Sequence, residues 1–317
     1  MIDRRKILAG SAAIAAALAL PARAQGKPAE IRIGTQKGGF FPAVRQRGQV
    51  EAAFKPLGID IKWVDFQFGP PLLEAINVGS VDFGYVGDAP PIFAQAGDAK
   101  IRYAAAVTSR GNNQAILVPQ DSPIRTLADL KGKKIAFGKG SSAHNLLVAA
   151  LEKANIAWTD IQPVPLAPAD ATAAFTKGAV DAWSIWDPYV ALAELKFNAR
   201  AIAWEHEVHS SNAFYIVGSD FVQKYPSLVA RLNETLAAEG RWADTHRDEV
   251  SKAQSEATGV DLEAVRRAVS RSTFAVGPVT DEVIITQQKV ADRFARLGLI
   301  PKPVRVADIV WKWTPGS

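Results

Sequence analysis

Short apolar runs alternate with glycine turns and helical apolar patterns along the first half of the chain. Residues 31–34 carry isoleucines at alternate positions and lead into a glycine loop at 37–39, after which an apolar helical pattern begins. Residues 59–64 alternate again, and a second helical pattern ends at Gly79 before another alternating run at 81–86. Alternation is typical of strands and a period near 3.6 of helices, so this order predicts a β-α-β-α-β unit.

The same order returns in the second half of the chain. Residues 134–138 lead into a glycine and serine loop at 140–142, residues 161–164 form a second strand candidate, and a helical pattern then ends at Gly178. Residues shared by the two copies lie 99 positions apart: Gly79 and Gly178, Asp82 and Asp181, Asp88 and Asp187. A repeat of this length is a whole lobe rather than a solenoid unit.

Two such units predict an α/β protein with two similar lobes. Each lobe should be a mainly parallel sheet flanked by helices, because right-handed crossovers connect parallel strands. Ligands of such sheets bind beyond the carboxyl ends of the strands. We therefore expect a ligand cleft between the two lobes.

The chain should cross between the lobes twice. A buried-strand run at 115–118 stops at the turn-rich segment 119–123, which predicts the first crossing, and 205–211 is the expected return before a strand at 213–217. The predicted division is 25–119 with 211–317 for the first lobe and 120–210 for the second.

The rest of the chain is helical. Asp261 and Thr280 are candidate N-caps, and Gly298 is a candidate helix end. One apolar face precedes that glycine: Val283, Val290, Phe294 and Leu297. We expect these helices to pack on the first lobe.

Residues 1–24 have the form of an export signal. Three basic residues at 4–6 precede an apolar run at 7–20, and Ala22-Arg23-Ala24 fits a small-x-small cleavage site. The 14 apolar residues fall short of the roughly 20 that a membrane span needs, which disfavours an anchor. We expect cleavage near Ala24 and release to the periplasm, by either the general or the twin-arginine route.

Charge and cysteine content narrow the partners. The formal net charge of +5 includes four basic residues and one acidic residue in 1–24, so the mature chain carries only +2. Nucleic-acid binding then has no electrostatic basis. The chain contains no cysteine, which excludes disulfides, lipid attachment at a cysteine and thiol chemistry. We expect a soluble monomer without cofactor or metal, since His206 and His209 have no close third ligand.

Four segments resemble a known family. Residues 72–94, 116–124, 127–136 and 181–189 are similar to the periplasmic substrate-binding subunits of ABC importers for aliphatic sulfonates, and the likeness extends over about 30–220. The resemblance implies a type II periplasmic binding protein fold, a small sulfonate ligand and ABC permease subunits as partners. Binders of nitrate, taurine and thiamine precursors share much of the pattern, so these ligands stay open.

A sulfonate is a permanent anion with three acceptor oxygens, so its site needs hydrogen-bond donors. Helix N-termini supply such donors together with a partial positive charge. Each predicted lobe has a strand-to-helix loop that fits. The candidates are Gln36, Lys37, Gly38 and Gly39 in the first lobe and Gly140, Ser141, Ser142, Ala143 and His144 in the second. An ordinary turn, a solvated Lys37 and a surface or capping His144 are the alternatives.

Further candidates follow the two repeated strands. Gly87, Asp88 and Ala89 end the first copy, while Trp186 and Asp187 end the second. The two aspartates either cap the next helix or contact an amino group of the ligand. Trp183 and Trp186 should lie on opposite faces of their strand, and Trp186 is the one we expect to wall an apolar ligand tail.

The sequence thus predicts a periplasmic binding subunit that captures an aliphatic sulfonate, with taurine, nitrate or a sensory ligand-presenting role as alternatives. An enzyme is disfavoured, because the sulfinate-cleaving enzymes that resemble these binders use a cysteine nucleophile.

Overall fold

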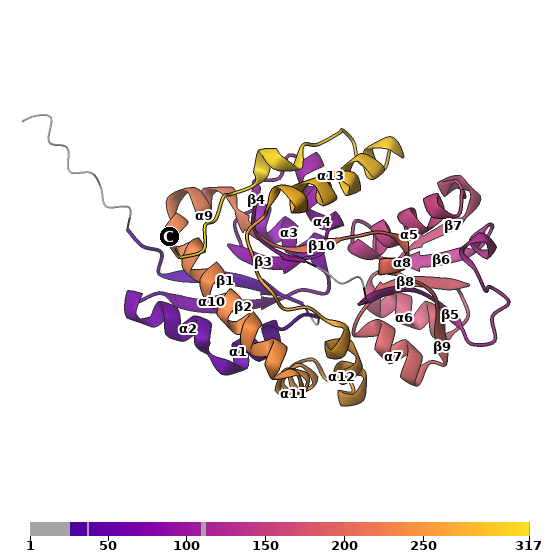
Figure 1. Ribbon diagram of the computed structural model, residues 1–317, viewed down its shortest axis with the longest axis horizontal. Coiled ribbons are helices and arrows are strands. Elements are labelled where there is room, and N and C mark those ends of the chain that lie inside the picture. The colour runs from indigo at the N-terminus through magenta and orange to yellow at the C-terminus, as the bar shows by residue number, and fades with distance from the viewer. Residues whose placement is uncertain (1–25, 37, 109–111, 317) are drawn as a thin grey trace, which may run out of the picture.

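A computed structural model describes residues 26–36, 38–108 and 112–316, so the predicted signal at 1–24 lies outside the described residues. Two five-stranded sheets lie side by side along the long axis (Figure 1). The first has the order β2-β1-β3-β10-β4: Asp60–Asp65, Glu30–Thr35, Phe83–Val86, Asn212–Gly218 and Ile101–Thr108. The second has the order β7-β6-β8-β5-β9: Gln162–Pro165, Lys134–Phe137, Ala182–Trp186, Gln114–Pro119 and Ala199–Trp204.

The sheets are mainly parallel, as expected, and each contains one antiparallel strand. β10 runs antiparallel to β3 and β4 in the first sheet, and β5 runs antiparallel to β8 and β9 in the second. Each of these strands begins directly after the chain has left the other sheet. Each sheet therefore contains one strand, antiparallel to its neighbours, that the chain forms just after it crosses from the other lobe.

The predicted first crossing at 119–123 is wrong. It places the run 115–118 in the first lobe, whereas β5 pairs with β8 and β9 of the second sheet, so the chain leaves the first sheet between Thr108 and Gln114. An apolar run marks a buried strand, but it does not show which of two sheets takes that strand. The return agrees better, because β10 begins at Asn212 in the first sheet.

Helices cover both faces of the first sheet. Along β10, Tyr215 and Val217 face one apolar core while Phe214 and Ile216 face another, since successive strand residues point to opposite sides. The first core packs under α1, α2, α10 and α11: Phe41–Arg47, Gln49–Phe54, Pro226–Thr245 and Arg247–Thr258. The second packs under α3, α4 and α13: Gly69–Asn77, Ala89–Ala96 and Asp281–Arg296. Helix α9, Ser219–Lys224, follows β10 directly.

The second sheet is buried in the same way. Ile116 and Val118 of β5 join the core under α5, and Ala115 and Leu117 join the core under α6 and α7. These helices span Ser142–Lys153, Pro168–Thr176 and Tyr189–Lys196, and α8 spans Glu205–Val208. Single 3-10 turns complete the chain: Lys55–Leu57, Leu127–Leu130, Trp158–Asp160 and Val306–Ile309.

The repeated glycines have the conformation that the pattern requires. Gly79 and Gly178 end α3 and α6 at φ values of 73° and 67°, a left-handed conformation that glycine adopts without a steric penalty. The repeated Asp82 likewise holds the strand start, because it accepts hydrogen bonds from the backbone and side chain of Arg32. Its counterpart Asp181 accepts from the backbone of Lys134.

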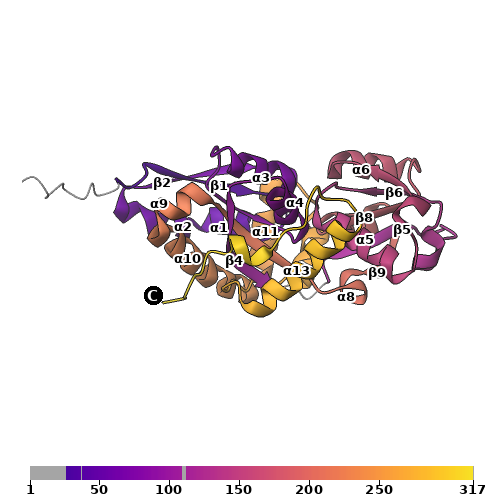
Figure 2. The ribbon, with the colours of Figure 1, turned by 90° about the horizontal axis from the view of Figure 1, so that it is seen from above.

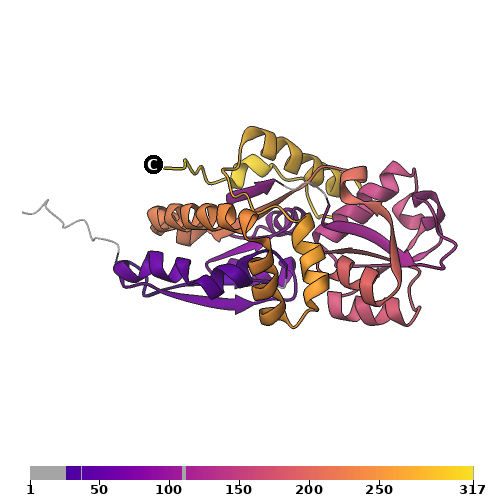
Figure 3. The ribbon, with the colours of Figure 1, turned by 60° about the horizontal axis from the view of Figure 1, so that its bottom comes forward.

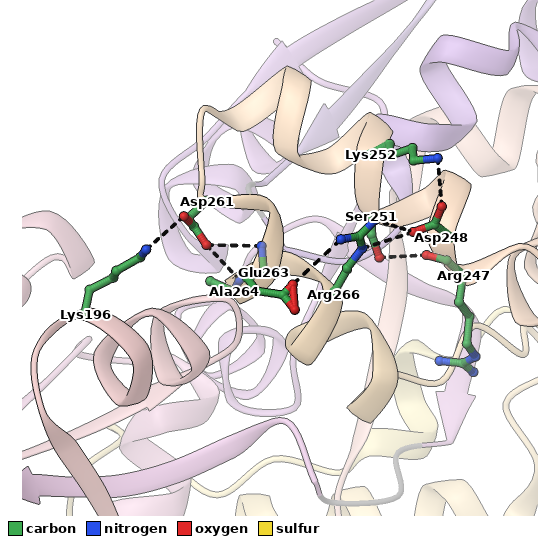
Figure 4. A network of polar contacts seen from close by, with 9 residues as sticks. All are labelled: Lys196, Arg247, Asp248, Ser251, Lys252, Asp261, Glu263, Ala264 and Arg266. Carbon is green, nitrogen blue, oxygen red and sulfur yellow. Dashed lines mark hydrogen bonds and ion pairs between the residues drawn. The ribbon is translucent and has the colours of Figure 1, made fainter.

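Helix α12, Leu262–Arg271, stands between the two lobes (Figures 1 and 3). Asp261 caps it, as predicted, and also accepts an ion pair from Lys196 of α7 at 3.0 Å (Figure 4). Arg266 pairs with Asp248 of α11 at 3.0 Å. The helix is thus tied to both lobes and does not pack on the first lobe alone.

Helix α13 extends from the first lobe toward the second (Figure 2). Thr280 caps its start as predicted, and Arg293 pairs with Glu152 of α5 at 2.7 Å. Of the predicted apolar face, Leu297 is 37% exposed and does not join the core, because the chain already turns away at this helix end. No helix among the described residues combines the length and the apolar character needed to cross a bilayer.

Candidate functional site

Two adjoining cavities lie between the lobes at the carboxyl ends of the strands. The main cavity has a volume of about 90 Å³. Its lining includes the residues that directly follow β1, β3 and β8: Gln36, Gly87 and Asp187. The side cavity, of about 50 Å³, opens from it beneath the loop Gly38–Phe41 and the segment Ser272–Phe274. Seven lining residues are common to both cavities, so they form one cleft.

The lobes touch each other across this cleft. A β-carbon built on Gly87 of the first lobe would lie 2.5 Å from the Ser142 Oγ of the second. A β-carbon on Gly38 would lie 3.2 Å from the Asp187 carbonyl oxygen. A side chain at position 87 would therefore force Ser142 to shift away from the first lobe.

The second lobe contributes the N-terminus of α5. Ser141 occupies the N-cap position, but its hydroxyl donates to the Gly138 carbonyl at 2.6 Å instead of accepting from the helix. The first turn of this 12-residue helix therefore has no side-chain cap, and Ser141 and Ser142 line the main cavity. An uncapped first turn attracts an anion through its N–H groups and the helix dipole.

The first lobe adds the loop before α1. Gly38 and Gly39 line both cavities, and Gln36 donates to the Tyr85 carbonyl at 2.7 Å, which fixes the loop to β3. Lys37, a predicted cation of this loop, lies outside the described residues.

Arg271 is the cation that sequence reasoning missed. It ends α12, lines the main cavity, and has a side chain that is only 18% exposed. Its guanidinium pairs with Glu194 at 2.6 Å, contacts Asp187 at 3.5 Å and lies 4.5 Å from the ring of Trp204. These contacts fix the Arg271 side chain, so its full positive charge stays at the cleft.

Asp187 lines both cavities. Its Oδ1 accepts from the Ala191 N–H at 3.0 Å, so the predicted capping role is present, while its Oδ2 faces Arg271. Burial raises the pKa of Asp187 to about 7, and the nearby Arg271 opposes that rise. A carboxyl group that titrates near neutrality therefore lies within a candidate anion site.

The other predicted aspartate has a structural position. Asp88 is 1% exposed and lies outside both linings; it accepts from the Ala89 N–H at 2.7 Å and from Asn145 of α5 at 2.6 Å. Burial raises its pKa to about 6. For Asp88 the structure thus shows the capping alternative, together with a link between the lobes.

His144 does not face the cleft either. It is 3% exposed, stacks on Phe137 at 4.7 Å between ring centroids, and accepts the Gly140 N–H at its Nδ1. Burial lowers the pKa of His144 to about 3, so the ring is neutral and adds no charge to the site.

The predicted site residues thus fall into two groups. Those that line the main cavity are Gln36, Gly38, Gly39, Gly87, Ser141, Ser142, Trp186 and Asp187. Those that lie behind its wall are Asp88, Ala89, Gly140, Ala143 and His144. Trp186, which we expected at the cleft because it precedes Asp187, lines the cavity, and Trp183 is fully buried in the core.

Several lining residues had no sequence signal. Asn113, Gln114, Ser211 and Asn212 belong to the two crossings between the lobes, and Tyr85 and Thr273 also line the cavity. The crossings are held together by Glu205, which is fully buried and accepts from Gln114 at 2.8 Å and from Ser211. Burial raises the pKa of Glu205 to about 8. Within the described ranges, no three His, Asp or Glu side chains are grouped as metal ligands.

Comparisons with known proteins show the family of this chain. The family model described as NMT1/THI5 like matches residues 54–277. An aliphatic sulfonates-binding protein of Escherichia coli (strain K12) is 38% identical over 292 residues, which are 92% of this chain and 91% of that protein.

Two solved structures agree over nearly the whole described chain. The alkanesulfonate-binding protein SsuA from Xanthomonas axonopodis pv. citri, bound to MOPS, has a TM-score of 0.85 at 40% identity and covers 90% of this chain and 99% of its own. The periplasmic aliphatic sulphonate binding protein SsuA from Escherichia coli has a TM-score of 0.82 at 37% identity, covering 92% and 94%. The expected two-lobed periplasmic binding protein fold is confirmed, and the chain belongs to the NMT1/THI5-like family, alongside these binding proteins.

Proposed function

We propose that this protein is the periplasmic ligand-binding subunit of an ABC importer and that it captures an aliphatic sulfonate between its lobes. The observation that carries the proposal is a cleft in which donors from both lobes meet beside one rigid cation, Arg271. The relatives described above, which are named for binding alkanesulfonates, support the same ligand class. They are binding proteins, which agrees with the expectation that the chain is not an enzyme.

The lining fits a sulfonate head group. Three acceptor oxygens with a permanent charge match the uncapped first turn of α5 at Ser142, the Gly38–Gly39 loop and the guanidinium of Arg271. Trp186 in the same cavity offers an apolar surface to the first carbons of the tail. Nitrate has acceptors but no tail, so it would leave that surface unused.

The setting of the protein follows from the same proposal. The mature chain begins near Gln25 after export to the periplasm, works as a monomer, and hands its ligand to the permease subunits of the importer. The predicted cleavage site and the monomeric state rest on the sequence, and N-terminal sequencing and sedimentation of the exported protein test them.

Calorimetry with a panel of anions tests the ligand class. Ethanesulfonate and butanesulfonate should bind with micromolar or better affinity, about −8 kcal/mol, and sulfate, phosphate and nitrate far more weakly. A preference for nitrate would overturn the sulfonate assignment, and heat from none of the anions would contradict the anion cleft itself.

A matched pair of variants locates the head group. Ser142→Asp places an acid at the first turn of α5, where it suits the helix but repels the ligand, so it should weaken binding more than the equally large but neutral Ser142→Asn, while the fold is kept. Ser227→Asp places the same acid in the first turn of α10, at an exposed position away from the cleft, and should leave binding unchanged. Equal effects of the two changes would argue against a head group at α5.

A further inference from the structure

The side cavity has aromatic walls. Five of its lining side chains carry six-membered rings: Phe40, Phe41, Tyr85, Tyr215 and Phe274. Its volume of about 50 Å³ is several times the 10–15 Å³ that one water molecule needs. A ligand whose head group occupies the main cavity can therefore place part of its tail among these rings.

The two charged groups of the cleft lie at different places along it. Arg271 lines the main cavity alone, whereas Asp187 lines the main and the side cavities and so lies where they join. The short contact of Arg271 is with Glu194 at 2.6 Å, and its contact with Asp187 is longer, at 3.5 Å. Arg267 also reaches Glu194, at 3.3 Å. Among the described residues, Arg271 and Asp187 are therefore the charged residues that line the cleft, and Glu194 and Arg267 lie behind its wall.

The Asp187 carboxyl, where the two cavities join, disfavours a ligand that carries only a negative charge. A plain alkanesulfonate brings its negative charge near the Asp187 carboxylate without a positive charge of its own, in a buried site where like charges repel strongly. A sulfonate with a protonated amine in its tail adds no net charge. Its ammonium group would meet the Asp187 carboxylate and the faces of the aromatic rings, both of which attract cations.

We propose that the cleft selects sulfonates whose tail carries a protonated amine, with the sulfonate near Ser142 and Arg271 and the ammonium in the side cavity beside Asp187. This inference rests on the proposed function and narrows its ligand class. Asp187 would then be the residue that determines specificity, because it is the acidic group that lines both cavities among the described residues.

Two ligands of equal shape test the inference. In 3-(dimethylamino)propane-1-sulfonate the tail is cationic, and in 4-methylpentane-1-sulfonate a carbon replaces the nitrogen. Because burial raises the pKa of Asp187 to about 7 while Arg271 lowers it and Glu194 raises it, titrations at about pH 8 keep this carboxyl mostly ionised. Buffers without a sulfonate group, such as Tris and phosphate, avoid competition from a second sulfonate.

The wild type should bind the amine about tenfold more tightly than its carbon analogue. Asp187→Asn removes the charge and keeps an oxygen for the Ala191 N–H, so it should weaken the amine and strengthen the analogue, which removes the preference. Asp220→Asn, an exposed change on α9, should keep the preference. Thermal melting monitored by circular dichroism confirms that each variant is folded.

Proton exchange gives a second measurement that needs no variant. Binding heats compared between the Tris and phosphate buffers should show proton uptake with the carbon analogue, because Asp187 must become neutral, and little or none with the amine. Equal affinity and equal proton uptake for the two ligands would overturn the inference and leave the sulfonate function standing. If neither ligand binds, nor any plain alkanesulfonate, the proposed function itself fails.

Discussion

Gly87 of the first lobe lies directly against Ser142 of the second, with room for a hydrogen but not for a methyl group between them. This contact joins the end of β3 to the start of α5, the two elements that border the main cavity from opposite sides. Because a ligand held by both lobes needs them to approach this closely, the fit at Gly87 controls whether the site can form.

Gly87→Ala should therefore weaken sulfonate binding. The added methyl group would lie 2.5 Å from the Ser142 Oγ, and overpacking of this kind costs about 1–3 kcal/mol, which is about 5- to 150-fold in affinity. Gly277→Ala is the control, since a β-carbon there has nothing within 4 Å. Calorimetry with butanesulfonate compares the two, and an unchanged affinity for Gly87→Ala would mean that the lobes bind the ligand without this contact.

The repeat in the sequence predicted most of the fold because its residues have local structural roles. Gly79 and Gly178 end helices at positive φ, and Asp82 and Asp181 bind the backbone of a neighbouring strand, so each residue type is fixed by its own surroundings. The sheet that takes β5 was not predictable in this way. That choice depends on pairing partners far along the chain, at Trp183 to Trp186 and at Ala199 to Trp204.

The candidate site was predicted only in part for the same reason. Loops at strand ends, such as Gly38–Gly39 and Ser141–Ser142, carry a local signal and do line the main cavity. His144 follows such a loop, but its ring turns into an aromatic cluster because that burial is available in the folded chain. Arg271 is 84 positions from the aspartate that it contacts, and no pattern within α12 distinguishes it from the neighbouring Arg267.

Those two arginines make a matched test of the cation. Arg271→Ala should lower the affinity for butanesulfonate about tenfold or more, since a hydrogen bond to a charged group contributes about 1.5–3 kcal/mol. Arg267→Ala removes an arginine that also contacts Glu194 but does not line either cavity, so its effect should stay within about twofold. Similar losses in both variants would show that the charge acts from a distance rather than by contact.

Glu205 should make the fold less stable as the pH rises. Burial raises its pKa to about 8, with the negative charge of Asp88 adding to the rise, so the folded chain binds a proton that the unfolded chain has released above about pH 5. Stability falls with pH where the folded state holds more protons, and this loss should extend through about pH 8. Denaturant unfolding at a series of pH values measures the slope.

Glu205→Gln identifies the group responsible. A glutamine oxygen can accept from Gln114 and Ser211 as the carboxyl does, without a charge to bury. The free energy of unfolding should then fall less between about pH 6 and pH 9, by about 1 kcal/mol or more. A slope identical to that of the wild type would assign the effect to the other buried carboxyls, Asp187 with a pKa of about 7 and Asp88 with a pKa of about 6, which act in the same direction.

Ligand binding should bring the lobes together in solution. The donors at Ser142 and at Gly38–Gly39 belong to different lobes, so one anion can bind both only when the two are as close as they are in this structure. Without ligand, the lobes are connected by two crossings at Gln114 and Ser211, which allow a hinge. Small-angle scattering should therefore show a smaller radius of gyration when butanesulfonate is added.

The Gly87→Ala variant makes this scattering result specific. Its added methyl group opposes the final approach of the lobes, so its radius should decrease less than that of the wild type at saturating ligand, while Gly277→Ala should match the wild type. A ligand shifts a conformational equilibrium only by binding one state better than the other. An unchanged radius at saturation in the wild type would mean that the ligand binds one lobe alone, and the contact between Gly87 and Ser142 would then exist before any ligand arrives.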